Sequence, residues 1–148
     1  MSLEKIIMND IKQAMLAKDS LRLDVCRSIK SALLLSKTEK DSTDLTKDKE
    51  LEILQKLLKQ RKESEKIYEA QSRLDLAQNE KNQANIISEY LPKPCSKEEL
   101  IEIVESVIIE LNINSKQEMG KLISTVLQKC KGRSDGKTIS DIVKERMA

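Results

Sequence analysis

Between residues 129 and 138 the chain gathers basic side chains around two glycines, a combination that can hold phosphate. The segment Gly132-Arg133-Ser134-Asp135-Gly136-Lys137-Thr138 is not a P-loop, which has four residues between its glycines and follows a strand, whereas here three intervene and a helix is expected before them. Backbone N–H groups at a helix N-terminus can still bind phosphate. In the alternative interpretation, Gly132 ends one helix and the loop caps the next. The candidate phosphate-binding residues are Lys121, Lys129, Lys131, Gly132, Arg133, Gly136 and Lys137.

Charge is distributed unevenly along the chain, although the net charge is only +2. Residues 96–118 carry two lysines against six acids, and residues 119–148 carry seven basic residues against three acids. The C-terminal end is therefore cationic. A secondary basic face is expected on a helix from Lys56, Lys59, Lys62 and Lys66, with a solvated helix face as the alternative. Without aromatic stacking platforms, any RNA would be held through its phosphates and in a salt-dependent way.

Several chemistries find no residues here. The chain has no histidine and no GxSxG or Ser-x-x-Lys motif, so we expect no catalytic residue. Cys26, Cys95 and Cys130 are far apart and form no CxxC, so we expect no metal and no cofactor. No stretch approaches the about 20 apolar residues of a membrane span. With charged residues throughout the first helix and reduced thiols, we expect a cytoplasmic protein with no membrane partner.

The elements that must position these residues are helices. Apolar residues recur at helical spacing over 3–17, and a second helix follows the cap at Asp19-Ser20. Residues 37–48 are polar and predict a loop, a third helix continues to about Ala70, and Ser72 with Asp75 predicts the capping box of a fourth. The expected inward residues of the first helix are Leu3, Ile7, Ile11, Ala14 and Met15.

Leu91-Pro92-Lys93-Pro94 cannot continue a helix and predicts a domain boundary. Beyond it, Ser96…Glu99, Ser115…Glu118 and Thr138…Asp141 are capping signals for three short helices. The fold class is therefore all-α with two helical subdomains: an N-terminal lobe of four helices (1–91), a linker (92–95) and a C-terminal three-helix lobe (96–148).

The third and fourth helices are expected to pack as a hairpin. Their inward positions alternate in steps of three and four, and folding them back about Gln71-Ser72 sets Arg61 opposite Glu80. We expect these two residues to form a structural ion pair that fixes the register of the hairpin.

These segments resemble a known family. Lys59-Gln60-Arg61-Lys62-Glu63-Ser64, Arg73-x-Asp75-Leu76-Ala77-x-x-Glu80 and Tyr90-Leu91-Pro92 resemble the N-terminal part of YqeY-like proteins of the GatB/YqeY family. Met119-Gly120-Lys121, Lys131-Gly132-Arg133-x-Asp135-Gly136 and Ile142-Val143-Lys144 resemble the C-terminal part. Two positions depart from the family pattern: Ser72 stands where a glycine is usual, and Gln83 where an acid is common.

The C-terminal motifs are similar to the tail domain of the B subunit of glutamine-dependent tRNA amidotransferase, which helps recognise tRNA. The resemblance implies a carbon–nitrogen ligase label with glutamine as amido donor, although no catalytic residue is recognisable in this chain. The leading hypothesis is a tRNA- or RNA-binding accessory module. The alternatives are a non-catalytic subunit or partner of a transamidation complex, with amidotransferase subunits as partners, and a helical protein-interaction adaptor.

Overall fold

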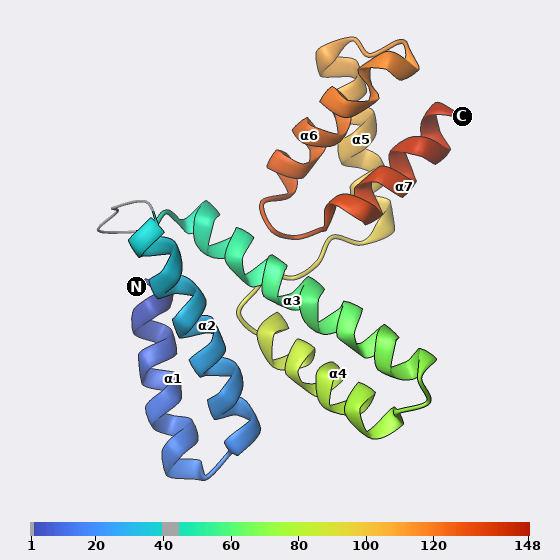
Figure 1. Ribbon diagram of the computed structural model, residues 1–148. Coiled ribbons are helices and arrows are strands. Elements are labelled where there is room, and N and C mark those ends of the chain that lie inside the picture. Colours follow the sequence, from blue (N-terminus) through green and yellow to red (C-terminus); the bar gives the residue numbers. More distant parts are fainter. Residues whose placement is uncertain (1, 40–44) are drawn as a thin grey trace. The chain divides into compact units, whose positions relative to one another are not determined.

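The computed structural model describes residues 2–39 and 45–148, and the described residues form helices and connecting turns without a strand (Figure 1). The all-α fold class is thereby confirmed. The chain divides into two compact units, Met1–Leu91 and Pro92–Ala148. Among the described residues, no helix combines the length and apolarity needed to cross a membrane.

The N-terminal unit consists of two helical hairpins, α1 (Leu3–Ala17) with α2 (Ser20–Glu39) and α3 (Lys47–Ala70) with α4 (Leu74–Ser88) (Figure 1). Helix α1 has the bounds that the sequence predicts. The polar loop expected over 37–48 is shorter at both ends, because α2 continues to Glu39 and α3 begins at Lys47; residues 40–44 lie outside the described residues. The core is aliphatic apart from one thiol: Leu3, Ile7, Val25, Cys26, Ile29, Leu33, Ile53, Leu54, Ile86 and Ile87.

Polar contacts join the elements of this unit. The Leu3 backbone N–H donates to Glu50 Oε2 over 2.9 Å and ties α1 to α3. The hydroxyl of Tyr90, just beyond α4, donates to the Asp10 carboxylate and lies 3.5 Å from the Cys26 thiol. Burial, and then the bond to Asp10, raise the pKa of Tyr90 above its ordinary value. The Tyr90 hydroxyl therefore stays protonated as a donor that links α1, α2 and the end of α4.

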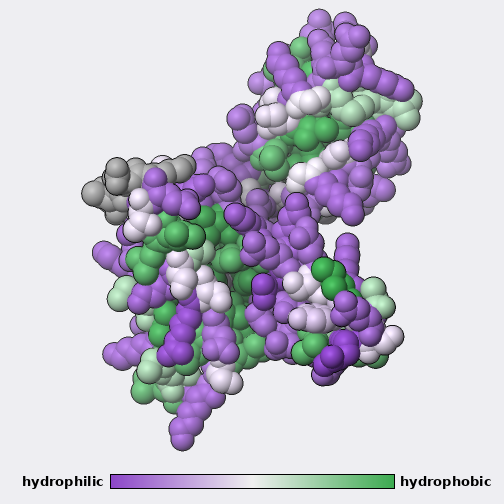
Figure 2. Space-filling model, in the orientation of Figure 1, coloured by the Kyte–Doolittle hydropathy of each residue, from purple (hydrophilic) through white to green (hydrophobic). Residues whose placement is uncertain are grey.

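Apolar side chains also remain on the surface of this unit. Met15, expected to face inward, is 56 % exposed, so that prediction was wrong. The apolar side chains of α1 lie on more than one face of the helix, and those buried in the core are Leu3, Ile7 and Ala14. Figure 2 shows apolar surface over α1 and α2. The exposed large apolar side chains of these two helices are Met8, Met15, Leu16, Leu34 and Leu35.

The C-terminal unit contains α5 (Lys97–Leu111), a single 3₁₀ turn η1 (Lys116–Glu118), α6 (Met119–Cys130) and α7 (Gly136–Met147). Each α-helix contributes a stripe at helical spacing to one core: Leu100, Val104 and Val107 from α5, Leu122, Val126 and Cys130 from α6, and Ile139, Ile142 and Val143 from α7. No aromatic residue is present here, since both tyrosines of the chain precede residue 92.

Two of the predicted helix caps form as expected. The Asp19 carboxylate accepts from the Arg22 N–H over 3.1 Å at the start of α2. Ser96 Oγ accepts from the Glu99 N–H over 3.1 Å at the start of α5. The cap predicted at Thr138 was wrong, because the Asp135 carboxylate accepts from the Thr138 N–H over 2.8 Å and α7 begins earlier.

The other two predicted caps were also wrong. Ser115 makes no capping bond; the Glu118 carboxylate accepts instead from the Asn114 N–H. Ser72 belongs to the end of α3, where it adopts a left-handed conformation with φ 58° and Arg73 N–H donates to the Tyr68 carbonyl. This is the geometry of a helix C-terminus and not of an N-cap.

Candidate nucleic-acid interface

The loop between α6 and α7 is built as the end of one helix and the start of another. Lys131 and Gly132 both have positive φ, 42° and 83°, the left-handed conformation that ends a helix and that glycine adopts without steric cost. The Asp135 carboxylate then caps the N-terminus of α7. An anion at this helix N-terminus would meet that negative charge, so the loop has the geometry of the capping alternative.

Two of the predicted phosphate-binding cations are engaged within the C-terminal unit. Arg133 Nη2 lies 2.8 Å from Glu99 Oε2, and its Nε donates to the Lys93 carbonyl over 2.9 Å. Lys129 Nζ pairs with the Glu110 carboxylate at 2.5 Å. Arg133 therefore holds residues 93–99 against the loop. The two ion pairs also neutralise part of the positive charge of the C-terminal unit.

The remaining cations lie on α6, in the loop and in the first turn of α7. Lys121, Lys131 and Lys137 are exposed, and none has a carboxylate oxygen within 4.0 Å among the described residues. At about 100° per residue, these exposed α6 residues share one side of the helix: Gly120, Lys121, Ser124, Leu127 and Gln128. We call these residues, together with Lys131, the α6 face.

The α6 face is also small and free of acids. No acidic residue occurs between Met119 and Ser134. A Cβ added at Gly120 would meet no atom within 4 Å, so the surface is open there. Gly120 and Ser124, which lie beside Lys121, have short side chains and leave room for a phosphodiester backbone near that lysine.

The secondary basic face on α3 has a different character. Lys56, Lys59, Lys62 and Lys66 are all exposed, and Lys59 Nζ lies 4.0 Å from Glu63 Oε1. Acidic residues alternate with these lysines along the exposed side of α3, as on a solvated helix surface.

The structure brings Arg61 and Glu80 together in the α3–α4 hairpin. Arg61 Nη1 lies 3.1 Å from Glu80 Oε2 and also donates to Gln83 Oε1 over 3.4 Å. Glu80 is 9 % exposed, and the geometry of this ion pair leaves its Oε2 without a hydrogen-bond donor among the described residues. The ion pair is therefore partly buried. Removal of Arg61 would leave the charge of the buried Glu80 carboxylate uncompensated.

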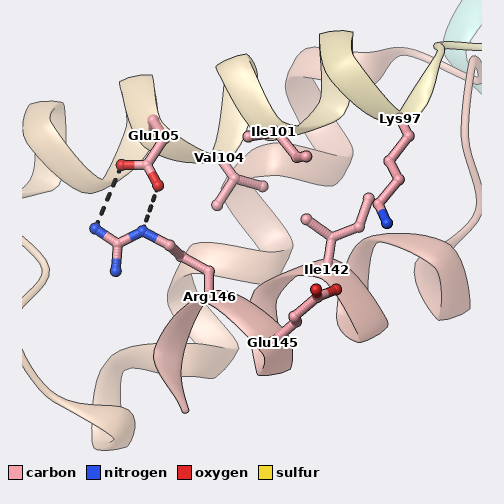
Figure 3. A pocket seen from close by; sticks show the side chains of 7 residues that line it. All are labelled: Lys97, Ile101, Val104, Glu105, Ile142, Glu145 and Arg146. Atoms are coloured by element: carbon pink, nitrogen blue, oxygen red, sulfur yellow. Dashed lines mark hydrogen bonds and ion pairs between the residues drawn. The ribbon is translucent and has the colours of Figure 1, made fainter.

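A groove between α5 and α7 was not predicted from the sequence. It encloses about 350 Å³, with Ile101, Val104 and Ile142 as its apolar floor and Lys97, Glu145 and the Arg146–Glu105 ion pair at its rim (Figure 3). Ile101 is 42 % exposed. The available signal was that apolar residues of α5 occupy more than one helix face, a pattern that residues 97–111 show when plotted at 100° per residue.

Metal-ligating side chains and thiols are the remaining groups of interest among the described residues. No group of three or more metal-ligating side chains comes together within residues 2–39 and 45–148. Cys26, Cys95 and Cys130 are unpaired thiols. Burial, and then the neighbouring Cys95 thiol, raise the pKa of Cys130 to about 11, so this thiol is neutral at physiological pH.

Comparison with known proteins finds relatives in yeasts. A Kluyveromyces lactis protein named "Altered inheritance of mitochondria protein 41, mitochondrial" is 32 % identical over 121 residues, which cover 76 % of this chain and 65 % of the relative. Proteins of the same name from Lachancea thermotolerans and Clavispora lusitaniae are each 32 % identical, over 69 % and 71 % of this chain. The matches span 56–65 % of the length of these relatives.

These relatives correct one prediction. Each is named as a mitochondrial protein, so the prediction of a cytoplasmic localisation was wrong by this comparison. The residue patterns on which that prediction rested, the reduced thiols and the charged first helix, do not distinguish the cytosol from the inside of an organelle.

A family model matches almost the whole chain. The family is described as Yqey-like protein, and the match runs over residues 4–147, through both compact units. It includes the hairpin motif with Arg61 and Glu80 and the motifs at the two ends of α6. The chain therefore belongs to the family of YqeY-like proteins.

Proposed function

We propose that this chain is an RNA-binding accessory protein that holds the phosphodiester backbone of tRNA or a tRNA-like RNA on its α6 face. The observation that carries the proposal is the acid-free stretch from Met119 to Ser134, with Lys121 and Lys131 exposed and without a carboxylate partner among the described residues. Phosphates interact with such cations by Coulomb attraction and counterion release, which require no base-specific groups.

The proposal includes the relation to transamidation that the motifs suggest. Met119-Gly120-Lys121 and Lys131-Gly132-Arg133, the motifs similar to the amidotransferase tail, lie at the two ends of α6. In this role the chain would present RNA to a transamidating enzyme as a non-catalytic partner. The contacts of the four cations suggest a division of labour: Lys121 and Lys131 contact RNA, while Arg133 and Lys129 stabilise the unit through Glu99 and Glu110.

The test is fluorescence anisotropy with labelled bulk tRNA at several salt concentrations. For single-stranded or duplex RNA each lost phosphate contact lowers the salt slope by about 0.7–0.9. The Lys121→Ala, Lys131→Ala double variant should therefore lower it by about 1.5 and weaken binding about 10-fold at low salt. A matched control, Lys62→Ala with Lys66→Ala, removes the same charge from α3 and should leave the slope unchanged.

Absence of tRNA binding at low salt, or equal weakening by the two double variants, would refute the α6 face as the binding surface. The first outcome would favour the helical adaptor, and capture of amidotransferase subunits by the RNA-deficient variant would favour a partner in a transamidation complex.

A further inference from the structure

Two of the three cysteines of the chain lie next to each other in the C-terminal unit. Cys130 is the last residue of α6, and Cys95 lies between Pro94 and the start of α5. The Cys95 N–H donates to the Arg133 carbonyl over 2.9 Å, and the Arg133 N–H donates to the Cys130 carbonyl over 3.0 Å. The backbones of Cys95 and Cys130 are therefore both hydrogen-bonded to the same residue, Arg133.

The side chains continue this proximity. Cys95 packs against the core cluster that contains Cys130. The Cys95 thiol acts directly on the Cys130 thiol, and this contact adds to burial in raising the pKa of Cys130. Cys26, by contrast, lies in the other compact unit beside Tyr90. Of the three possible pairs, the structure prepares one.

The two thiols differ in access. Cys95 is half-buried and lines a cavity of about 300 Å³ with Thr138 and Asp141, so a small disulfide can reach it from solution. Cys130 is 1 % exposed, so a reagent in solution does not reach it directly. The pair therefore has an accessible first thiol and a protected second thiol that can attack only its neighbour.

We propose that Cys95 and Cys130 form a reversible intramolecular disulfide by exchange with a low-molecular-weight disulfide such as oxidised glutathione. The site is a redox modification site next to Lys131 at the end of α6, and its formation does not rest on the proposed RNA binding.

The disulfide forms by two successive thiol–disulfide exchange reactions. The Cys95 thiolate attacks one sulfur of oxidised glutathione, whose S–S bond breaks and releases one glutathione thiolate. The Cys130 thiolate then attacks Cys95 Sγ, and the second glutathione leaves. Two protein thiols are oxidised, one glutathione disulfide is reduced to two glutathiones, and the two thiol protons end on the glutathione thiolates. Because Cys130 is mostly neutral, the second step is the slower one and quickens as the pH rises.

The disulfide would change how the segment before α5 is held. In the reduced protein, two hydrogen bonds, each over 2.9 Å, hold residues 93–95 to Arg133. The oxidised protein would hold Cys95 on the end of α6 by a covalent bond that salt and loss of the Arg133 side chain cannot release. Oxidation would thus fasten the chain that leads out of the C-terminal unit.

The experiment titrates the reduced full-length protein with glutathione redox buffers, traps free thiols by alkylation, and locates crosslinked peptides by mass spectrometry. We expect one Cys95–Cys130 link and one free Cys26. Cys26→Ser should leave the titration unchanged, and Cys130→Ser should stop at a mixed glutathione disulfide on Cys95. Because the native fold holds the pair together, half-oxidation should need at least about 10-fold less oxidised glutathione than in the urea-unfolded chain.

Three results would overturn the proposal: links to Cys26 in similar yield, a mixed disulfide in the wild type that never proceeds to the crosslink, or equal titrations of the folded and unfolded chain.

Discussion

Removal of Arg61 from the α3–α4 hairpin tests how far a buried charge depends on its partner. In Arg61→Met the aliphatic part of the side chain is kept and the guanidinium is lost. Glu80, whose side chain is 12 % exposed, would then keep a carboxylate with no cation beside it. We therefore expect the N-terminal unit to lose stability.

The size of the loss follows from burial. Breaking a fully buried ion pair costs about 3–5 kcal/mol because a charge is left without compensation. Here the Arg61 side chain is 32 % exposed, so water and the nearby Gln83 amide can recover part of that energy. We expect a loss of about 2 kcal/mol for Arg61→Met. The double variant Arg61→Met, Glu80→Leu should lose less than about 1 kcal/mol, because neither charge remains.

The chain contains its own probe for this measurement. Its only aromatic residues are Tyr68 and Tyr90, both in the N-terminal unit. Tyrosine fluorescence during urea unfolding therefore follows that unit alone, whereas far-ultraviolet circular dichroism follows both. With an m-value of about 1–2 kcal/mol/M, a loss of about 2 kcal/mol moves the midpoint down by about 1–2 M urea.

The reasoning is refuted if Arg61→Met leaves the tyrosine-detected midpoint unchanged. It is also refuted if the double variant is as unstable as the sum of the single variants, because the two residues would then not be coupled. Lys62→Met, a neighbouring exposed lysine changed to the same residue, is the matched control and should change the free energy of unfolding by less than about 0.5 kcal/mol.

Three further predictions concern local features. Ser72→Gly should stabilise the N-terminal unit by about 0.5–1 kcal/mol, measured by the tyrosine-detected midpoint, since glycine accepts the left-handed φ without strain; a loss would show that the turn is unstrained. Because the pKa of Cys130 is raised in the folded state, the C-terminal unit should lose stability as pH rises from about 8.5, the ordinary thiol value, to about 11. The loss should be absent in Cys130→Ala when circular dichroism melts are compared. Asp135→Ala removes the cap of α7 and should cost about 1 kcal/mol in the same melts, whereas Asp135→Asn should cost little.

Most of the fold was predictable because it depends on local periodicity. The first helix and the end of the third lie where apolar spacing places them, and the facing positions of α3 and α4 bring Arg61 to Glu80. The misplaced caps at Ser72 and Thr138 have one cause. The Ser/Thr-x-x-Asp pattern can recur near a helix start, and only the backbone conformation decides which oxygen reaches an unpaired N–H.

The candidate site was predictable in composition but not in geometry. The excess of cations after residue 119 is visible in the sequence. What each cation does depends on tertiary contacts, since Arg133 meets Glu99 from 34 residues away and Lys129 meets Glu110 on another helix. The α5–α7 groove likewise arises only when two helices pack.

The hairpin arrangement has a kinetic consequence. In the N-terminal unit the most extensive packing joins α1 to α2 and α3 to α4, helices that follow one another along the chain. Short connections make loop closure entropically cheap, and proteins dominated by such local contacts fold within microseconds to milliseconds. Each hairpin can therefore collapse as soon as its second helix is available, and the slower event is the docking of α2 on α4, which completes the aliphatic core.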